Sequence, residues 1–335
     1  MLKLFLLGLG LVTLIALVWH VGPARLLDAV ADLGPAALLV ILLPSLLMYL
    51  LEAYGWRLTL GKSGAGISFP RLLAVRTAGE VVNMTTPTAY MGGEPLKAYL
   101  LKSRGVPLVE GFASVITAKT TMTIAEVAFI LLGLGLAIGI LGGAPGSRGI
   151  IVAASVTVGM LVLAMTVFLL AQHRGLFTGL LGLLRRLHLR IAFLEHREQK
   201  LRELDETIGH FYSRDRRAFT LSLLAFFLGW MAEALEVYAI LYYLGVPIDP
   251  WSAIAIAALS VFIKGGTFFI PGSVGAQEGG NLLLLLAFGY TDVTGLAFSI
   301  LRRLREVAWI AIGLGCLGGL GGRFAKTPQL DLSQR

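Results

Sequence analysis

The chain has 335 residues, of which 56% are apolar and only 14% are charged, with one cysteine and a formal net charge of +8. A soluble protein usually carries about 25% charged residues, so the polar side chains here are too few to cover a globule. The same numbers exclude a disordered chain, a nucleic-acid-binding tail and a disulfide framework. We therefore expect an all-α polytopic membrane protein, whose 41 glycines suit closely packed membrane helices.

Six stretches are long and apolar enough to cross a bilayer, which takes about 20 residues. They are residues 2–19, 35–60, 106–140, 149–171, 218–244 and 293–320. The first resembles a signal peptide because Lys3 precedes its apolar run. No small-x-small cleavage site follows it, so we interpret it as a retained anchor.

Two further apolar regions, residues 67–102 and 251–288, are interrupted by proline and glycine. Proline removes a backbone donor and glycine weakens a helix, so we expect each region to form a broken, re-entrant helix pair. Two kinked spans in each region are the alternative. The residues expected at the breaks are Pro87, Gly92, Gly93, Pro271, Gly272 and Gly275.

The basic residues predict the orientation of the chain. Residues 172–217 hold ten Lys and Arg residues and form the only long polar segment, so the positive-inside rule places this linker in the cytoplasm. Counting spans outward from the linker places both termini in the cytoplasm. The linker therefore separates an N-terminal half, residues 1–171, from a C-terminal half, residues 218–322, and a cytoplasmic tail follows at residues 323–335.

The linker also has an amphipathic pattern. Leucine and isoleucine recur at helical spacing, with arginines on the opposite face, at Leu180, Leu184, Leu187, Ile191 and Leu194. This pattern predicts a helix that lies on anionic lipid headgroups. A helix packed against the bundle is the alternative, and nucleic-acid binding is not expected in a polytopic protein.

An offset of 184 residues aligns the two halves with each other, with 15 identities in the 65 positions from 52 to 116. Glu52 falls on Glu236, and Glu94 falls on Glu278. An odd number of crossings separates the copies, so the sequence predicts an inverted-topology repeat in which each copy contains one broken segment. Paired discontinuous helices in inverted repeats are typical of transporters that expose one midplane site alternately to each side.

Ionisable groups inside spans are costly and usually mark sites. We expect an anion site in which Lys119, Arg303 and the half-helix N-termini bind phosphate, while Glu94 and Glu278 pair with these cations when the site is empty or titrate during transport. Structural ion pairs are the alternative, and Glu233 and Glu236 are equally able to serve the site or to pair with a neighbouring base. The candidate substrate-binding residues are Glu94, Lys97, Lys119, Glu278, Arg302, Arg303, Arg76, Asn83, Tyr90, Gln277 and Asn281.

Two segments carry a family resemblance: TPTAYMGGEPLK at residues 86–97 and PGSVGAQEG at residues 271–279. They resemble the two signature regions of the flippase-like membrane domain family related to the transmembrane part of lysylphosphatidylglycerol synthase, and look closest to its hopanoid-biosynthesis-associated branch. The resemblance covers residues 2–320 and implies a bacterial inner-membrane protein that moves a lipid between leaflets. By carry-over it singles out Pro87, Gly93, Glu94, Lys97, Pro271, Gly275 and Glu278, with Arg302 or Arg303 in the following span.

The chain departs from the family pattern in the span after the first signature. Many members carry an acidic-basic pair there, whereas this chain has Lys119-Thr120, so a lysylated lipid is not implied. The soluble aminoacyl-transfer domain of the bifunctional synthases is also missing from the sequence, which ends about 15 residues after its last predicted span.

We therefore expect a lipid translocator that uses alternating access and no cofactor or metal. Its substrate would have an anionic or polar headgroup, or be an isoprenoid or hopanoid lipid. The sequence has no Walker loop, nucleotide fingerprint or nucleophile–base pair, so we do not expect an enzyme. An intramembrane lipid-modifying enzyme and a non-transporting scaffold for lipid-biosynthesis enzymes are the alternatives, and the lipid, the energy source and the oligomeric state stay open.

Overall fold

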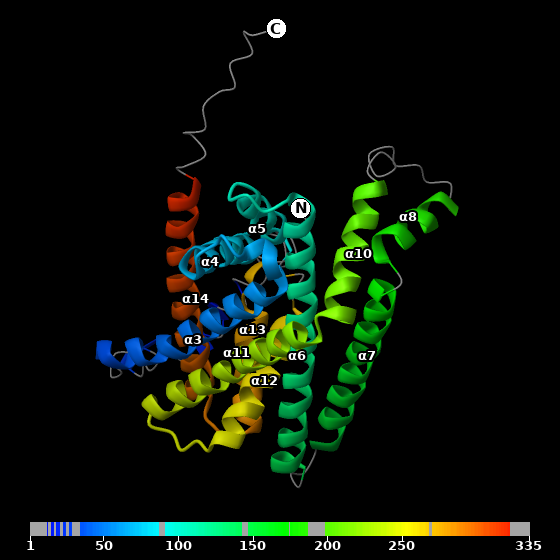
Figure 1. The fold of residues 1–335 in the computed structure, drawn as a ribbon. Helices are drawn as coiled ribbons and strands as arrows, with labels where there is room; N and C mark the ends of the chain where they lie inside the picture. Colours follow the sequence, from blue (N-terminus) through cyan, green and yellow to red (C-terminus); the bar gives the residue numbers. More distant parts are fainter. Residues whose placement is uncertain are drawn as a thin grey trace.

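A computed structural model describes residues 34–86, 91–142, 147–173, 175–186, 198–267 and 270–321, together with single positions between 12 and 28. Within these residues every regular element is a helix, which confirms the predicted all-α fold (Figure 1). The predictions for Pro87 and Tyr90, for most of residues 2–19, for the middle of the linker (187–197) and for the tail at 323–335 lie outside the described residues.

Three of the described helices are long and apolar enough to cross a membrane by themselves: α3 (Gly34–Leu60), α6 (Leu108–Leu141) and α11 (Arg216–Tyr243). A fourth, α7 (Ser147–His173), turns by 89° into α8 (Leu176–Arg186). The last predicted span forms α14 (Asp292–Gly321), whose centre carries four charged residues. These helices match the predicted spans from residue 35 onward.

Both interrupted regions form pairs of short helices. The first consists of α4 (Phe69–Thr85) and α5 (Gly93–Lys102), and the second of α12 (Pro250–Gly266), the short 3-10 helix η2 (Pro271–Ser273) and α13 (Ala276–Ala287). In the first pair Gly93 lies against Gly79, and in the second Gly280 lies against Ile263, so the second helix folds back along the first. Each region is therefore a helical hairpin, and its re-entry from one side of the membrane stays a prediction, with two kinked spans as the alternative.

The turn of the second hairpin depends on glycine. Gly272 and Gly275 have φ of 62° and 76°, in the left-handed region that favours a residue without Cβ. The backbone N–H of Gly275 donates to the Glu278 carboxylate at 2.6 Å, which caps the N-terminus of α13. Glu278 thus closes the break through a local hydrogen bond.

The internal repeat is visible in the helices. α6 begins at Leu108 and α14 begins 184 residues later at Asp292, while α4 and α12 both have 17 residues. The hairpins exchange partners, because α4 packs on α14 and the equivalent α12 packs on α6. At the centre α3 packs along α11 and runs in the opposite direction (Figure 1). Corresponding helices of the two halves thus make corresponding contacts, since α5 and α13 in turn pack on the long helix of their own half.

The linker contains α8 and α10 (Glu198–Arg214). The carboxylate of Asp205 accepts hydrogen bonds from the backbone N–H groups of Phe177 and Thr178, at 3.1 and 2.9 Å, and so joins α10 to the start of α8. Leu204 and Ile208 of α10 are buried in one cluster with a residue of α6. This part of the linker packs against the bundle, whereas Leu180 on α8 is exposed; its contact with anionic lipid stays a prediction.

The contact between the two helices of the first hairpin yields a stability prediction. A Cβ on Gly93 would lie 1.8 Å from the carbonyl oxygen of Gly79, whereas a Cβ on Gly139 of α6 would meet nothing within 4 Å. We expect Gly93→Ala to lower the free energy of unfolding by about 1–3 kcal/mol through overpacking. Gly139→Ala is the matched control, and thermal unfolding in detergent, followed by size-exclusion chromatography, compares the two. Equal midpoints for both variants would show that the hairpin contact is not close.

Candidate functional site

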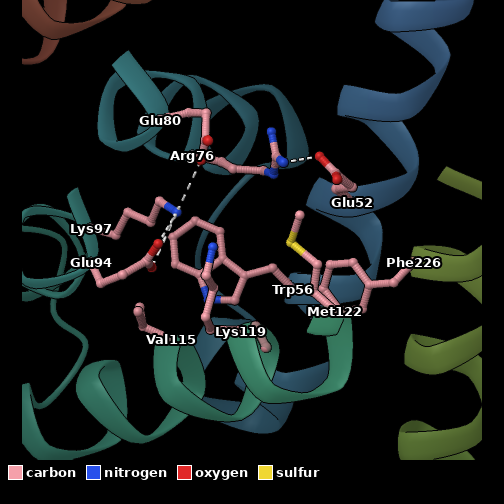
Figure 2. A pocket seen from close by; sticks show the side chains of 11 residues that line it. Glu52, Trp56, Arg76, Glu80, Glu94, Lys97, Val115, Lys119, Met122 and Phe226 are labelled. Atoms are coloured by element: carbon pink, nitrogen blue, oxygen red, sulfur yellow. Dashed lines mark hydrogen bonds and ion pairs between the residues drawn. The ribbon is translucent and has the colours of Figure 1, made fainter. Parts of the chain in front are cut away.

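A cavity of about 240 Å³, here called the central cavity, lies between the two halves and is lined by residues of α3, α4, α6, α11, α12 and α14. A smaller cavity of about 30 Å³, the side chamber, shares five of its lining residues and extends to α5 (Figure 2). The charged residues of the central cavity are Glu52, Glu80, Glu126, Glu233, Glu306, Arg76, Lys119, Lys264, Arg302 and Arg305. Such a density of charge inside an apolar bundle is expected at a binding site or an ion path.

On the N-terminal side, α3 and α4 are joined by an ion pair between Glu52 and Arg76 (Figure 2). Both side chains are buried, and the Arg76 guanidinium also lies 4.8 Å from the centre of the Tyr49 ring. A buried charge without a partner is strongly destabilising, so this pair fixes how α3 faces α4.

The first hairpin brings together three of the predicted site residues. The Lys97 amine donates to Glu94 at 3.0 Å and lies 3.8 Å from Glu80. The Asn83 amide donates to Glu94 at 3.0 Å and accepts a hydrogen bond from the backbone N–H of Gly93 at 2.7 Å. Glu94 therefore pairs with the cation of its own helix, whereas we had expected it to pair with Lys119 or Arg303.

On the C-terminal side, α11 and α14 are joined by a network of four charges. Arg302 donates to Glu233 at 2.5 Å, and Arg305 donates to Glu236 at 2.5 Å and to Glu233 at 3.5 Å. All four side chains are buried. Glu233 and Glu236 therefore pair with neighbouring bases, which is one of the two alternatives that the sequence leaves open.

The second hairpin has its own ion pairs with α14. Arg303 donates to Glu278 and, at 2.6 Å, to Glu306, which also accepts from Lys264 at 2.7 Å. Glu278 thus pairs with the predicted cation Arg303. Gln277 and Asn281, also predicted at the site, are buried on α13 but outside both the central cavity and the side chamber.

Two charged groups of the central cavity differ from the rest. Among the residues that the structure describes, Lys119 and Glu126 are the two charged groups lining this cavity that form no ion pair within 4 Å. They lie seven residues apart on α6, which is two helical turns on one face. The Lys119 amine points into the side chamber (Figure 2). Lys119 is therefore a cation whose charge is available to a ligand, while its repeat equivalent Arg303 is held by two carboxylates.

Aromatic residues that the sequence did not single out also line the central cavity. Trp309 stacks on Tyr49 with ring centres 3.8 Å apart, and its indole N–H donates to Ser45 at 2.9 Å. Glu52 entered the sequence analysis only in the alignment of the two halves. Its alignment with Glu236 could have indicated that both carboxylates are buried and paired. Within the described part of the chain no cluster of three or more His, Cys, Asp or Glu residues could hold a metal ion.

Comparison with known proteins identifies the family. The family described as the lysylphosphatidylglycerol synthase TM region matches residues 2–315. The chain belongs to this family. A UPF0104 membrane protein of Methanothermobacter thermautotrophicus is 25% identical over 325 residues, which cover 92% of each chain. A UPF0104 membrane protein of Pyrococcus horikoshii is 27% identical over 333 residues, which cover 93% of this chain and 95% of that protein.

Family membership confirms the resemblance seen in the two signature segments and shows that the chain is a membrane protein. The signature residues Glu94, Lys97 and Glu278 all take part in the ion pairs beside the central cavity. The hopanoid-associated branch, the inner membrane and the cytoplasmic position of both termini stay predictions.

The ion-pair network yields a second stability prediction. Arg305 is 5% exposed and is the closest partner of Glu236, so we expect Arg305→Met to lower the free energy of unfolding by about 3–5 kcal/mol. Arg202 is 65% exposed and pairs with Glu198 on the surface of α10, so Arg202→Met should change it by less than about 1 kcal/mol. Thermal unfolding of both variants in detergent checks the difference. A similar small shift for both would mean that the α11–α14 network does not stabilise the fold.

Proposed function

We propose that the protein moves a lipid between the two leaflets of a membrane by alternating access to the central cavity. The observation that carries this proposal is the position of that cavity between two equivalent halves, each of which contributes a hairpin and long helices. Inverted repeats with broken helices at the midplane are the architecture of carriers in which one half rocks against the other. The family, whose description refers to the membrane region of a lipid synthase, supports a lipid as the substrate.

The charges in the cavity support a polar or anionic headgroup. A phosphate that reaches Lys119 would form a charge-assisted hydrogen bond with a cation that lacks a protein partner. Lys264 is also accessible, because its side chain is 27% exposed while it pairs with Glu306. The other cations are held by carboxylates, so they support the walls of the cavity and leave Lys119 as the main contact for the ligand.

The ion pairs between helices also suggest how the cavity changes access. Arg302 and Arg305 connect α14 to α11 within the C-terminal half, and Arg76 and Glu52 connect α4 to α3 within the N-terminal half. Breaking a buried pair without a replacement costs about 3–5 kcal/mol, so these pairs favour movement of each half as a unit. The two halves would therefore rock against each other around the central cavity without loss of the pairs.

A lipid-modifying enzyme is the alternative function, because the carboxylates that line the cavity could serve as acids or bases. We include in the proposal an inner-membrane location with both termini in the cytoplasm and the linker on anionic lipid. A lipid-modifying enzyme would form product in detergent, where no second leaflet exists.

Replacing the free cation tests the proposal. In vesicles that contain a fluorescent phosphatidylglycerol, we expect the wild-type protein to expose inner-leaflet probe to dithionite, and Lys119→Met to slow this exchange at least about tenfold through loss of a charge-assisted contact. Lys102→Met is the matched control, because Lys102 is exposed at the end of α5 and should leave the rate unchanged.

Two outcomes would contradict the proposal. One is exchange by wild-type protein no faster than in protein-free vesicles, for phosphatidylglycerol and for an isoprenoid phosphate probe alike. The other is exchange by Lys119→Met at the wild-type rate, with both proteins unfolding at the same temperature.

A further inference from the structure

A second concave surface adjoins the central cavity. It is a groove of about 470 Å³ between α6, α7 and α12, here called the apolar groove. Its walls are formed mainly by aliphatic and aromatic side chains, including Val127, Ile130, Leu161, Met165, Phe168 and Phe262. Water gains few hydrogen bonds in such a groove, so the groove suits an apolar occupant.

The apolar groove is continuous with the charged site. Glu126, Val261 and Gly265 line both the groove and the central cavity. At this junction Gly265 leaves the passage open, because a Cβ placed on it would meet nothing within 4 Å. The molecule therefore offers one path that begins at Lys119 among charges and ends beside Phe168 among apolar side chains.

We propose that the apolar groove holds a hydrocarbon chain of the lipid whose headgroup occupies the central cavity. The proposal rests on the translocator function and specifies where the apolar part of its substrate lies. An amphiphile matches both ends of the path, because its headgroup can pair with the charges and its hydrocarbon chain can fill the groove. An apolar helix of a partner protein would leave the charges without a polar partner, and a soluble anion would leave the groove empty. The apolar groove between α6, α7 and α12 is then the lateral entrance through which the lipid arrives from the bilayer.

The proposal separates two faces of α7. Met165 lines the apolar groove, whereas Met160 is 58% exposed on the outside of the same helix and does not line it. Five residues at about 100° per residue place the two side chains on different sides of the helix. A bulky residue at Met165 should fill the groove, and the same residue at Met160 should not.

The experiment uses the full chain in vesicles with a phosphatidylglycerol probe that carries a photoreactive diazirine near the end of one acyl chain. We expect irradiation to attach the probe to the peptide that contains Met165 and Phe168, as located by mass spectrometry. Met165→Trp should reduce both the amount of this adduct and the rate of leaflet exchange at least about fivefold, because the indole would occupy the space of the acyl chain. Met160→Trp should leave both unchanged.

The possible failures distinguish this inference from the proposed function. If a folded Met165→Trp variant exchanged lipid at the wild-type rate, the groove would not be the site of the hydrocarbon chain, although translocation would stand. Equal amounts of adduct on the two faces of α7 would lead to the same conclusion. A second copy of the chain cross-linked across the groove would also overturn the inference. A further outcome is an adduct in the groove that Met165→Trp abolishes, while the wild-type protein shows no leaflet exchange. It would support the groove as a lipid-binding site and overturn the proposed transport.

Discussion

A charge buried in an apolar helix bundle is costly unless an opposite charge or a hydrogen-bond partner lies beside it, and this constraint organises the centre of the protein. The pairs join helices that are distant in sequence, such as α11 and α14 through Glu236 and Arg305. Glu52 and Arg76 do the same for α3 and α4. Because each pair fixes the rotation of two helices, the network defines the walls of the central cavity and leaves Lys119 as the cation that faces it without a carboxylate partner.

The proposed transport needs a second feature, which is a pair of halves that can move against each other. The first helix of each hairpin packs on the long helix of the other half, and the second packs on the long helix of its own half, so each hairpin lies at the boundary between the halves. The close contact of Gly93 with Gly79 lets α5 return along α4 and places Lys97 and Glu94 at the edge of the side chamber. The residues that line the site therefore lie where the two halves meet.

Much of this architecture could be predicted from the sequence. Composition and hydrophobic runs indicated the spanning helices, proline and glycine located both hairpins, and the offset of 184 residues identified the elements that correspond. The partners of the charges were harder to predict, because pairing depends on the depth and rotation of helices that only tertiary packing sets. Arg302 and Glu233 are 69 residues apart in the chain. By contrast, the Glu94–Lys97 pair has the i,i+3 spacing of helix neighbours, so this departure from our expectation was visible in the sequence.

The central claim is that the cavity between the halves holds an amphiphile, with its headgroup at Lys119 and its hydrocarbon chain in the apolar groove between α6, α7 and α12. A structure determined at high resolution from protein extracted with its native membrane lipids tests this most directly. We predict density for a headgroup within hydrogen-bond distance of the Lys119 amine, continuous past Glu126 and Gly265 with density for a chain along the apolar groove. Ordered lipid confined to the outer surface of the bundle, with only water beside Lys119, would contradict the account.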